Sequence, residues 1–330
     1  MSPGGPSAPT PPTPPTPPGP SATEPRSLRW RPGRPVPVRT ILSPLRRGGG
    51  DPTWRADADG SVWRATRTPA GPVTLRVRPD PAAGEVRAEA WGPGAEWALD
   101  GVPELLGDAD RDVADFVPAH PALVAAWKAH PHWRVPRTRA VFEALSASAL
   151  EQVVTGLEAF AAWRFLLRKH GEPAPGPVPL LLPPTPEGWG RIPSWDWLAA
   201  GVELRRRRVT IVAAPRAAGL ERTLDLAPDD ADRALRSLPG VGVWTSAEVR
   251  QRAHGHADAF SFGDYHVAKN VSHALVGEVL DDAGCAEVIE VYRGHRYRVQ
   301  RLLELAGHRR PRLAPRMTLP THTPNRAVRR

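Results

Sequence analysis

The chain has 330 residues, a formal net charge of +9, 41 prolines, 12 tryptophans and a single cysteine. One cysteine excludes a disulfide within the chain, a cysteine-ligated iron–sulfur cluster and a zinc site built from cysteines. The excess of basic residues suits a polyanionic partner. No run of about 18 apolar residues occurs, so no membrane-spanning helix is expected.

The two ends of the chain lack the apolar side chains of a folded core. Residues 1–27 consist mostly of Pro, Thr, Ser and Gly. Because such a segment buries too little surface to offset the entropy of ordering, a disordered arm is predicted there. It has no apolar stretch of the kind found in a signal peptide. Residues 311–330 are basic and aperiodic, and they are predicted to form a disordered tail.

Residues 28–118 carry the signals of strands. Residues 53–56 and 62–66 flank a turn that ends at Asp59-Gly60, and residues 73–78 and 86–90 alternate apolar with polar side chains around a second turn. Both pairs predict β-hairpins with one apolar face. We therefore expect a small antiparallel α+β module in this part of the chain.

Residues 119–310 are predicted to form an all-helical domain. Apolar residues from Phe142 to Leu167 follow helical spacing, and His170-Gly171 is a stop signal. A proline-rich connector at 173–186 precedes more helix, from about Ser194 to Arg208. The run Arg205–Arg208 is typical of a solvated helix face, with phosphate contact as the alternative. The fold class expected for the whole chain is α+β.

A glycine hairpin between two predicted helices is the first feature that indicates a binding site. Residues 228–238 predict a helix with acidic residues in its first turn, and a second helix is expected to run to about His254. Pro239 ends the first helix, and Gly240 and Gly242 allow a tight turn. The alternative is an ordinary αα-turn.

Backbone N–H groups left free at such a hairpin favour an anion such as a DNA phosphate. The predicted phosphate contacts are the backbone of Gly240, Val241, Gly242 and Thr245, together with the Thr245 hydroxyl. The carbonyl groups of Leu238 and Val241 are the predicted ligands of a monovalent cation, Na⁺ or K⁺.

The residues that follow the hairpin show which protein family the pattern resembles. Leu238-Pro239-Gly240-Val241-Gly242-Val243-Trp244-Thr245 is followed by Asp258-Ala259-Phe260 and Asp264-Tyr265. In order and spacing, these segments resemble the 3-methyladenine DNA glycosylase II family of the helix-hairpin-helix–Gly/Pro/Asp superfamily. That family carries LPG[VI]GxWTA, then DxF, then the catalytic DY. The resemblance implies a TBP-like α+β module before an all-helical glycosylase domain.

The resemblance also implies a function. It is that of a monofunctional glycosylase of base-excision repair, which flips alkylated purines of the 3-methyladenine and 7-methylguanine type out of duplex DNA and hydrolyses their glycosidic bond. Asp264 matches the catalytic carboxylate. Trp244 and Tyr265 match aromatic residues of the base pocket. Related enzymes with lyase activity carry a Schiff-base lysine at the position of Trp244, so no lyase step is expected.

Further positions complete the expected site. Val153 lies in a segment that resembles the family's source of a wedge side chain, and Lys269 is a further phosphate candidate. The family has another aromatic residue where this chain has Glu248, which leaves the substrate range open. Asp258 is interpreted as structural. His254, His256, His266 and His273 match no zinc motif, so no metal site is expected beyond the hairpin cation.

Two alternatives remain. The same chemistry on deaminated or oxidised bases is one, and a non-catalytic helix-hairpin-helix DNA-binding protein is the other. The expected partner is double-stranded DNA with a damaged base, bound by a monomer. The expected location is the bacterial cytoplasm at the nucleoid, with no membrane association, no iron–sulfur cluster and no organic cofactor.

Overall fold

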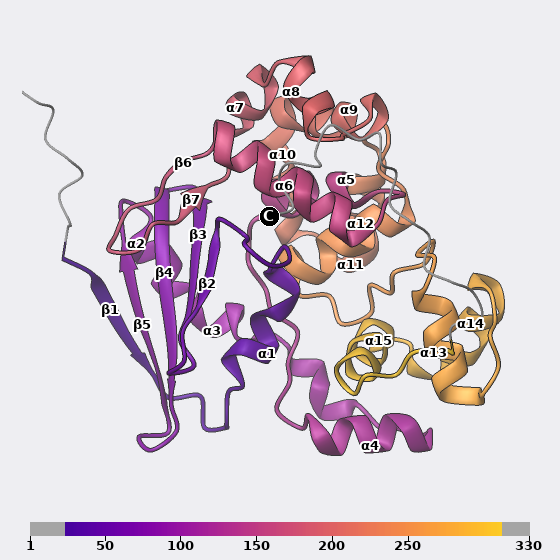
Figure 1. The fold of residues 1–330 in the computed structure, drawn as a ribbon. Coiled ribbons are helices and arrows are strands. Elements are labelled where there is room, and N and C mark those ends of the chain that lie inside the picture. The colour runs from indigo at the N-terminus through magenta and orange to yellow at the C-terminus, as the bar shows by residue number, and fades with distance from the viewer. Residues whose placement is uncertain (1–23, 312–330) are drawn as a thin grey trace, which may run out of the picture.

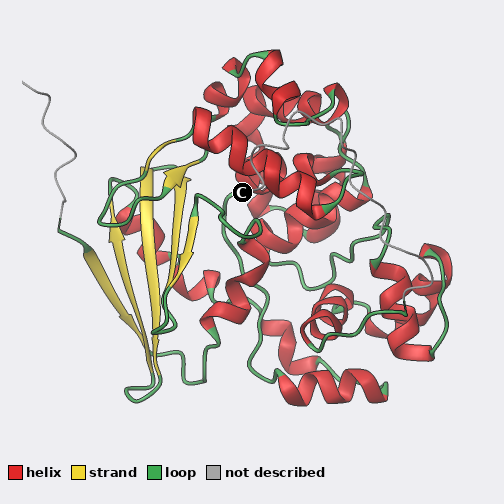
Figure 2. Cartoon of the chain, in the orientation of Figure 1, coloured by secondary structure: helices red, strands yellow, loops and turns green. Residues whose placement is uncertain are grey.

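The computed structural model describes residues 24–311. An antiparallel sheet forms one side of the molecule, and helices form the remainder (Figures 1 and 2). The predicted α+β class, an antiparallel module before a helical domain, is confirmed. The predicted arm and tail lie outside the described residues, except for residues 24–27 and 311, and Arg26 and Ser27 belong to the first strand.

The sheet has five strands in the order β1-β5-β4-β3-β2, and every neighbouring pair is antiparallel. Both predicted hairpins are present, as β2–β3 and β4–β5. The β3–β4 pairing joins them into one sheet, and β1 adds an edge beside β5. The strands are β1 (Arg26–Trp30), β2 (Trp54–Ala56), β3 (Val62–Thr68), β4 (Gly71–Asp80) and β5 (Glu85–Trp91).

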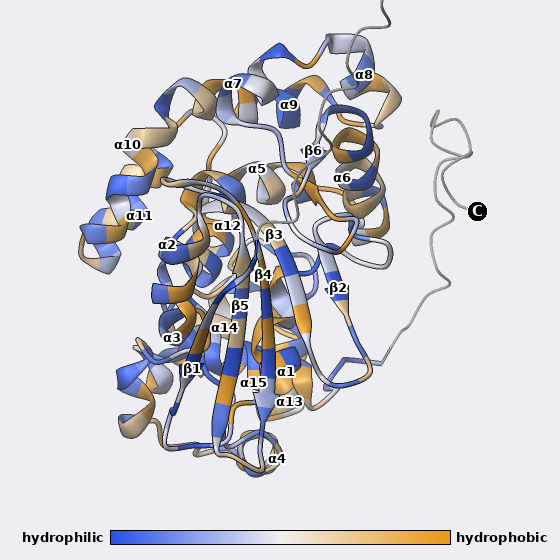
Figure 3. Ribbon diagram, turned by 90° about the vertical axis from the view of Figure 1, so that its left-hand side faces the viewer, coloured by the Kyte–Doolittle hydropathy of each residue, from blue (hydrophilic) through white to orange (hydrophobic). Residues whose placement is uncertain are grey.

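Apolar and polar side chains alternate along the strands, as the bands in Figure 3 show. One face of the sheet consequently packs against the main core. Val73, Leu75 and Val77 of β4 point into the main core. Part of the opposite face is covered by the connector, where Trp63 and Trp91 stack with ring centroids 5.3 Å apart. This connector forms a small hairpin from β6 (Glu172–Pro173) and β7 (Leu181–Leu182).

The helices fall into those that pack with the sheet and those that form a core of their own. The helices with buried residues in the sheet's core are α1 (Val38–Leu42), α2 (Ala95–Asp100), α3 (Val102–Leu105), α4 (Pro121–Ala129), α13 (Val267–Val276), α14 (Asp282–Ile289) and α15 (Arg296–Leu305). The helices with buried residues in the second core are α5 (Val141–Glu151), α6 (Gly156–His170), α7 (Pro186–Arg191), α8 (Ser194–Ala199), α9 (Leu204–Ala213), α10 (Ala217–Glu221), α11 (Pro228–Arg236) and α12 (Val243–Val249).

The chain therefore crosses between two cores twice. It enters the second core near residue 140 and leaves it after a π-helical turn, Arg250–His254, that continues α12. The segment 255–266 then leads back to α13 and the sheet's core (Figure 1). This second crossing carries both Asp258 and Asp264.

The long helical pattern from Phe142 to Leu167 is divided into two helices. A capping box, in which the Thr155 side chain bonds the Glu158 backbone and the Glu158 side chain bonds the Thr155 backbone, starts α6 as a new helix. Helical periodicity continues across the break, so the sequence pattern alone gave no sign of the loop at 152–155.

A buried ion pair joins the first module to the last helix. Arg298 of α15 donates two hydrogen bonds to Asp110, at 2.8 and 2.5 Å, and both side chains are almost fully buried. The Asp110 carboxylate also accepts the Val135 N–H at 2.9 Å. Because burial removes both charges from water, each depends on the other for compensation.

We predict that Asp110→Ala lowers the free energy of unfolding by about 3–5 kcal/mol, because Arg298 is then a buried charge without its partner. Urea unfolding followed by tryptophan fluorescence measures this loss. Glu96→Ala is the control, since Glu96 pairs with Arg26 on the surface and such pairs contribute little. Equal stability changes in the two variants would contradict the prediction.

Candidate active site

The hairpin between α11 and α12 is closed by its own backbone. Gly240 has φ +88°, and a Cβ at this residue would lie 2.7 Å from the Val209 side chain. Only glycine fits both constraints. The Val241 N–H donates to the Leu238 carbonyl at 3.0 Å and completes the turn. The predicted tight turn is therefore present, and Val209 of α9 lies next to it.

Some of the predicted phosphate contacts are available and others are used internally. Among residues 24–311, the N–H groups of Gly240, Gly242 and Thr245 donate to no protein acceptor. The Val241 N–H is taken by Leu238, and the Thr245 side chain is only 3% exposed. The predictions of phosphate contacts from the Val241 N–H and the Thr245 hydroxyl are therefore not supported, because the Val241 N–H closes the turn and the Thr245 hydroxyl is buried against Gln152.

The hairpin carbonyl groups retain acceptor capacity. The Leu238 carbonyl accepts one hydrogen bond, and the Val241 carbonyl accepts none from the described residues. A carbonyl oxygen has two lone pairs, so this oxygen set fits a monovalent cation. Elsewhere in the described part of the chain, no group of three or more His, Cys, Asp or Glu side chains is arranged to hold a metal ion.

The loop between α5 and α6 lies against the hairpin. Gln152 donates to the Gly240 carbonyl at 3.0 Å and to the Thr245 hydroxyl at 2.8 Å. The next residue, Val153, is 85% exposed and has φ +54°. A left-handed conformation is rare for a β-branched residue and costs free energy. Val153, the predicted wedge, is thus presented to solvent beside the hairpin.

Arg206 holds the other side of this loop. It donates to the Leu150 carbonyl at 3.0 Å and to the Gly201 carbonyl at 2.7 Å. Its burial lowers the pKa of the guanidinium. The expectation of a solvated Arg205–Arg208 face is therefore wrong at this position, because the guanidinium caps two carbonyls that would otherwise lack partners.

Asp264 is fixed by the start of the following helix. One oxygen of its carboxylate, Oδ1, accepts the N–H groups of His266 at 2.7 Å and Val267 at 3.0 Å. These bonds satisfy donors at the beginning of α13 and orient the side chain. No donor among the described residues bonds to Oδ2. The carboxylate is therefore held by one oxygen and open at the other.

Trp244 lies next to the Asp264 loop. Gly263, which directly precedes Asp264, has φ +86°, and a Cβ there would lie 3.6 Å from the Trp244 Cβ. Trp244 itself is partly exposed at the first turn of α12. The start of α12 and the residue before Asp264 thus lie next to each other.

Hydrogen bonds hold the segment before Asp264 in place at both of its ends. Asp258 accepts the Gly294 N–H at 2.8 Å and the Arg296 Nε–H at 2.8 Å, which agrees with its interpretation as structural. The hydrogen bond to Asp258 raises the pKa of Arg296. The Gly263 N–H donates to Asp282 of α14 at 2.7 Å. Helices α14 and α15 therefore hold the loop in place.

Tyr265 lies on the surface. It is 69% exposed, and the Lys269 ammonium lies 4.2 Å from its ring centroid, a cation–π geometry. The Arg310 guanidinium lies 5.9 Å from the same centroid. This arrangement places two positive charges beside the Asp264 loop, and it places Tyr265 outside any closed pocket.

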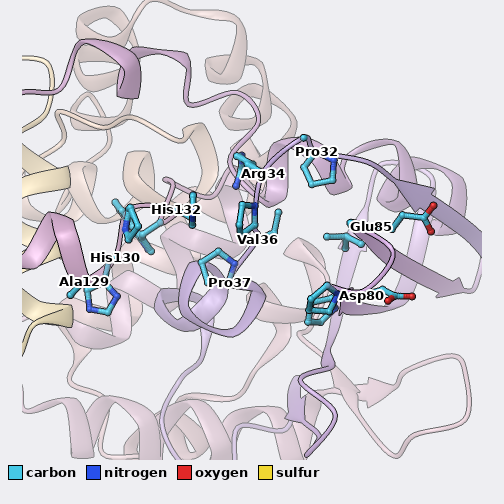
Figure 4. A pocket seen from close by; sticks show the side chains of 17 residues that line it. Pro32, Arg34, Val36, Pro37, Asp80, Glu85, Ala129, His130 and His132 are labelled. Carbon is cyan, nitrogen blue, oxygen red and sulfur yellow. The ribbon is translucent and has the colours of Figure 1, made fainter.

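A cavity of about 560 Å³ lies elsewhere (Figure 4). It is lined by segments 32–37, 79–81, 84–86 and 129–133, and it contains none of the predicted site residues. It is therefore separate from the Asp264 site. Among residues 24–311, no helix has both the length and the apolar character that crossing a membrane requires.

Comparisons with known proteins show which solved structures share the fold of this chain. Neither the family models nor the curated proteins contain a match to this sequence. Among solved structures, the 3-methyladenine DNA glycosylase from Archaeoglobus fulgidus is similar, with a TM-score of 0.70 and 17% identity over 85% of this chain and 98% of that chain. The apo 8-oxoguanine glycosylase/lyase from Clostridium acetobutylicum has a TM-score of 0.63 and 15% identity over 85% of this chain and 97% of that chain.

This chain has the fold of the DNA glycosylases. The same Clostridium acetobutylicum enzyme bound to double-stranded DNA is also similar, with a TM-score of 0.60 and 15% identity over 81% of this chain and 89% of that chain. The resemblance seen in the sequence is thus confirmed at the level of the fold. The fold explains why the hairpin, the loop at 152–155 and the Asp264 loop, which are distant in sequence, meet in one region.

His254 at the end of the π-helical turn is buried, and His256, two residues later, is partly buried. His254 and His256 have ring centroids 5.1 Å apart, and His254 is hydrogen-bonded to the Thr223 hydroxyl. Burial, followed by nearby positive charges such as Arg250, lowers the pKa of His254 from 6.5 to about 3 and that of His256 to about 4. The two rings lie together at the end of the π-helical turn.

This pair predicts a loss of stability in acid. Between the folded-state and unfolded-state pKa values the unfolded chain binds more protons, so stability is full above pH 6.5 and falls as the pH drops towards 4. We expect the variant carrying His254→Gln and His256→Gln to lose less stability between pH 7 and pH 5 than the wild type. Urea midpoints at each pH measure the slopes, and equal slopes would contradict the assignment.

Proposed function

We propose that this protein is a monofunctional DNA glycosylase that removes alkylated purines from duplex DNA. The observation that carries the proposal is the Asp264 carboxylate, held through Oδ1 by the start of α13 and open at Oδ2, on the loop whose Gly263 lies beside the Trp244 side chain. The free hairpin N–H groups and the cations beside Tyr265 supply the complementary surface for phosphates.

The chemistry follows from the carboxylate. As the bond between C1′ and the base nitrogen breaks, the base leaves with the electron pair and the sugar gains oxocarbenium character. The negative charge of Asp264 stabilises that cation, and Oδ2 can accept a proton from the water that adds to C1′. An alkylated purine already carries positive charge, so it departs as a neutral base.

Trp244 accounts for two further parts of the proposal. Its ring can stack on a flipped base, and a stacked aromatic face favours a cationic purine. It also occupies the position at which lyases of the resembled superfamily have a nucleophilic lysine. The lysines of this chain are Lys128, Lys169 and Lys269, and only Lys269 lies beside the Asp264 loop.

Val153 and the hairpin complete the mechanism. An extruded base leaves a gap in the stack, and an apolar side chain that enters the gap offsets part of the cost. Val153 is exposed, and the hydrogen bond from the adjacent Gln152 to the hairpin holds its loop in place. We propose that Leu238 and Val241 hold a Na⁺ or K⁺ ion that neutralises the phosphate beside the hairpin. We further propose that the protein acts as a monomer on nucleoid DNA.

A second candidate function keeps this chemistry and changes the base. The similarity to the 8-oxoguanine glycosylase/lyase, almost as extensive as that to the 3-methyladenine enzyme, favours an oxidised purine as the alternative substrate. A panel of duplexes with methylated, deaminated or oxidised bases separates the two candidates.

We predict that the wild type releases 3-methyladenine or 7-methylguanine from methylated duplex DNA, and that Asp264→Asn lowers the rate by about 100-fold to 1,000-fold. Asparagine still accepts the His266 and Val267 N–H groups, so folding and DNA binding should persist. Chromatography of released bases measures the rate.

Strand cleavage tests the monofunctional assignment. Product strands should break only after alkali, and borohydride should trap no covalent adduct. A trapped adduct that disappears in Lys269→Gln would show a lyase step instead. Absence of base release across the whole panel would overturn the catalytic proposal.

We predict that Val153→Ala lowers the base-release rate by about tenfold, because two methyl groups at about 0.8 kcal/mol each no longer fill the stack. Fluorescence of a 2-aminopurine next to the lesion reports flipping directly. Val117→Ala is the matched control, because Val117 is also an exposed valine but lies between the sheet module and α4. Equal effects in the two variants would contradict the wedge role.

A further inference from the structure

Ser261 connects the Asp264 loop to the interior. It lies three residues before Asp264, is only 1% exposed, and its carbonyl accepts the Asp264 N–H at 3.2 Å. Its hydroxyl donates to Glu248 at 2.7 Å and accepts from Gln251 at 2.8 Å and Gln300 at 3.1 Å. One hydroxyl thus joins α12, the π-helical turn, α15 and the loop.

Glu248 is the charged end of this connection. Its second carboxylate oxygen accepts from Arg252 at 2.6 Å, and Arg252 in turn donates to the Pro44 carbonyl at 3.1 Å. Although burial lowers it, the nearby Glu248 and Glu151 carboxylates raise the pKa of Arg252 above its usual value. The carboxylate therefore has a partner for each of its oxygens.

Through its position in α12, Glu248 links this contact to the candidate active site. Glu248 lies one helical turn after Trp244, where the resembled family has an aromatic residue. In this chain the side chain is buried and faces the loop anchor. The same helix consequently presents Trp244 to the site and fixes the backbone that carries Asp264.

We infer that Glu248 is a positioning residue for Asp264 and acts through the Ser261 hydroxyl. This inference rests on the proposed glycosylase function of Asp264. The Ser261 carbonyl and the Asp264 N–H form one turn, so a shift of Ser261 moves the carboxylate with it. A catalytic group displaced by about 1 Å can lose about 100-fold in rate.

The chain contains a matched arrangement elsewhere. Glu143 of α5 pairs with Arg64 and accepts the Thr66 hydroxyl, so it too is a carboxylate between an arginine and a hydroxyl. It joins α5 to β3 and has no contact with the Asp264 loop. Loss of the Thr66 hydroxyl therefore reproduces the structural change without affecting the loop.

The experiment compares Ser261→Ala with Thr66→Ala in the full chain. We expect Ser261→Ala to lower the single-turnover rate of base release by about tenfold to 100-fold with the affinity for lesion DNA unchanged. Thr66→Ala should change neither quantity. Glu248→Gln keeps an oxygen that accepts from Ser261, so its rate should lie closer to that of the wild type than the rate of Ser261→Ala.

Hydrogen exchange of the free protein supplies a readout that is independent of activity. The Ser261 and Gly263 amides, which donate to Gln300 and Asp282, should exchange faster in Ser261→Ala and at the wild-type rate in Thr66→Ala. Unchanged loop exchange in Ser261→Ala would overturn the inference, and so would an equal loss of activity in both alanine variants. If the wild type releases no base, the proposed function fails while the exchange result still decides the positioning role.

Discussion

The structure depends on how the crossing segment 255–266 is held. Ala257 and Phe260 of this segment are buried in the sheet's core, and hydrogen bonds fix the path of the chain between and beyond them. These bonds join Asp258 to Arg296 of α15, Ser261 to Glu248, and Gly263 to Asp282. Because buried polar groups without partners are costly, each of these bonds favours one conformation of the loop. The position of the Asp264 carboxylate is consequently set by elements of both cores at once.

The loop at 152–155 and the hairpin are held by hydrogen bonds in the same way. Gln152 joins this loop to the hairpin, and Arg206 caps the carbonyl at the end of α5. Val153 keeps a left-handed conformation that a free loop would relax, so its surroundings must impose it. Under the proposed function, a side chain held in place before binding loses less entropy on contact with DNA. The loop and the hairpin are joined into one unit by Gln152.

Burial divides the charged groups into two classes. Arg206 and Arg298 are buried, Arg252 is largely buried, and all three connect elements, whereas Lys269 and Arg310 lie beside the exposed ring of Tyr265. Only the second class is available to phosphates. A high content of arginine thus contributes to the architecture as well as to the positive surface.

The sequence by itself determined the local features. Alternation of side chains gave both hairpins of the sheet, and the glycine spacing gave the turn at Gly240, because these patterns depend on neighbours in the chain. The resemblance to a known family singled out Asp264 and Trp244, and their roles remain part of the proposed function. Only the tertiary structure decided that Arg206 is buried, that the Thr245 hydroxyl is used by Gln152, and that Glu248 faces Ser261. These outcomes depend on contacts between segments far apart in the chain, and periodicity within one segment carries no information about them.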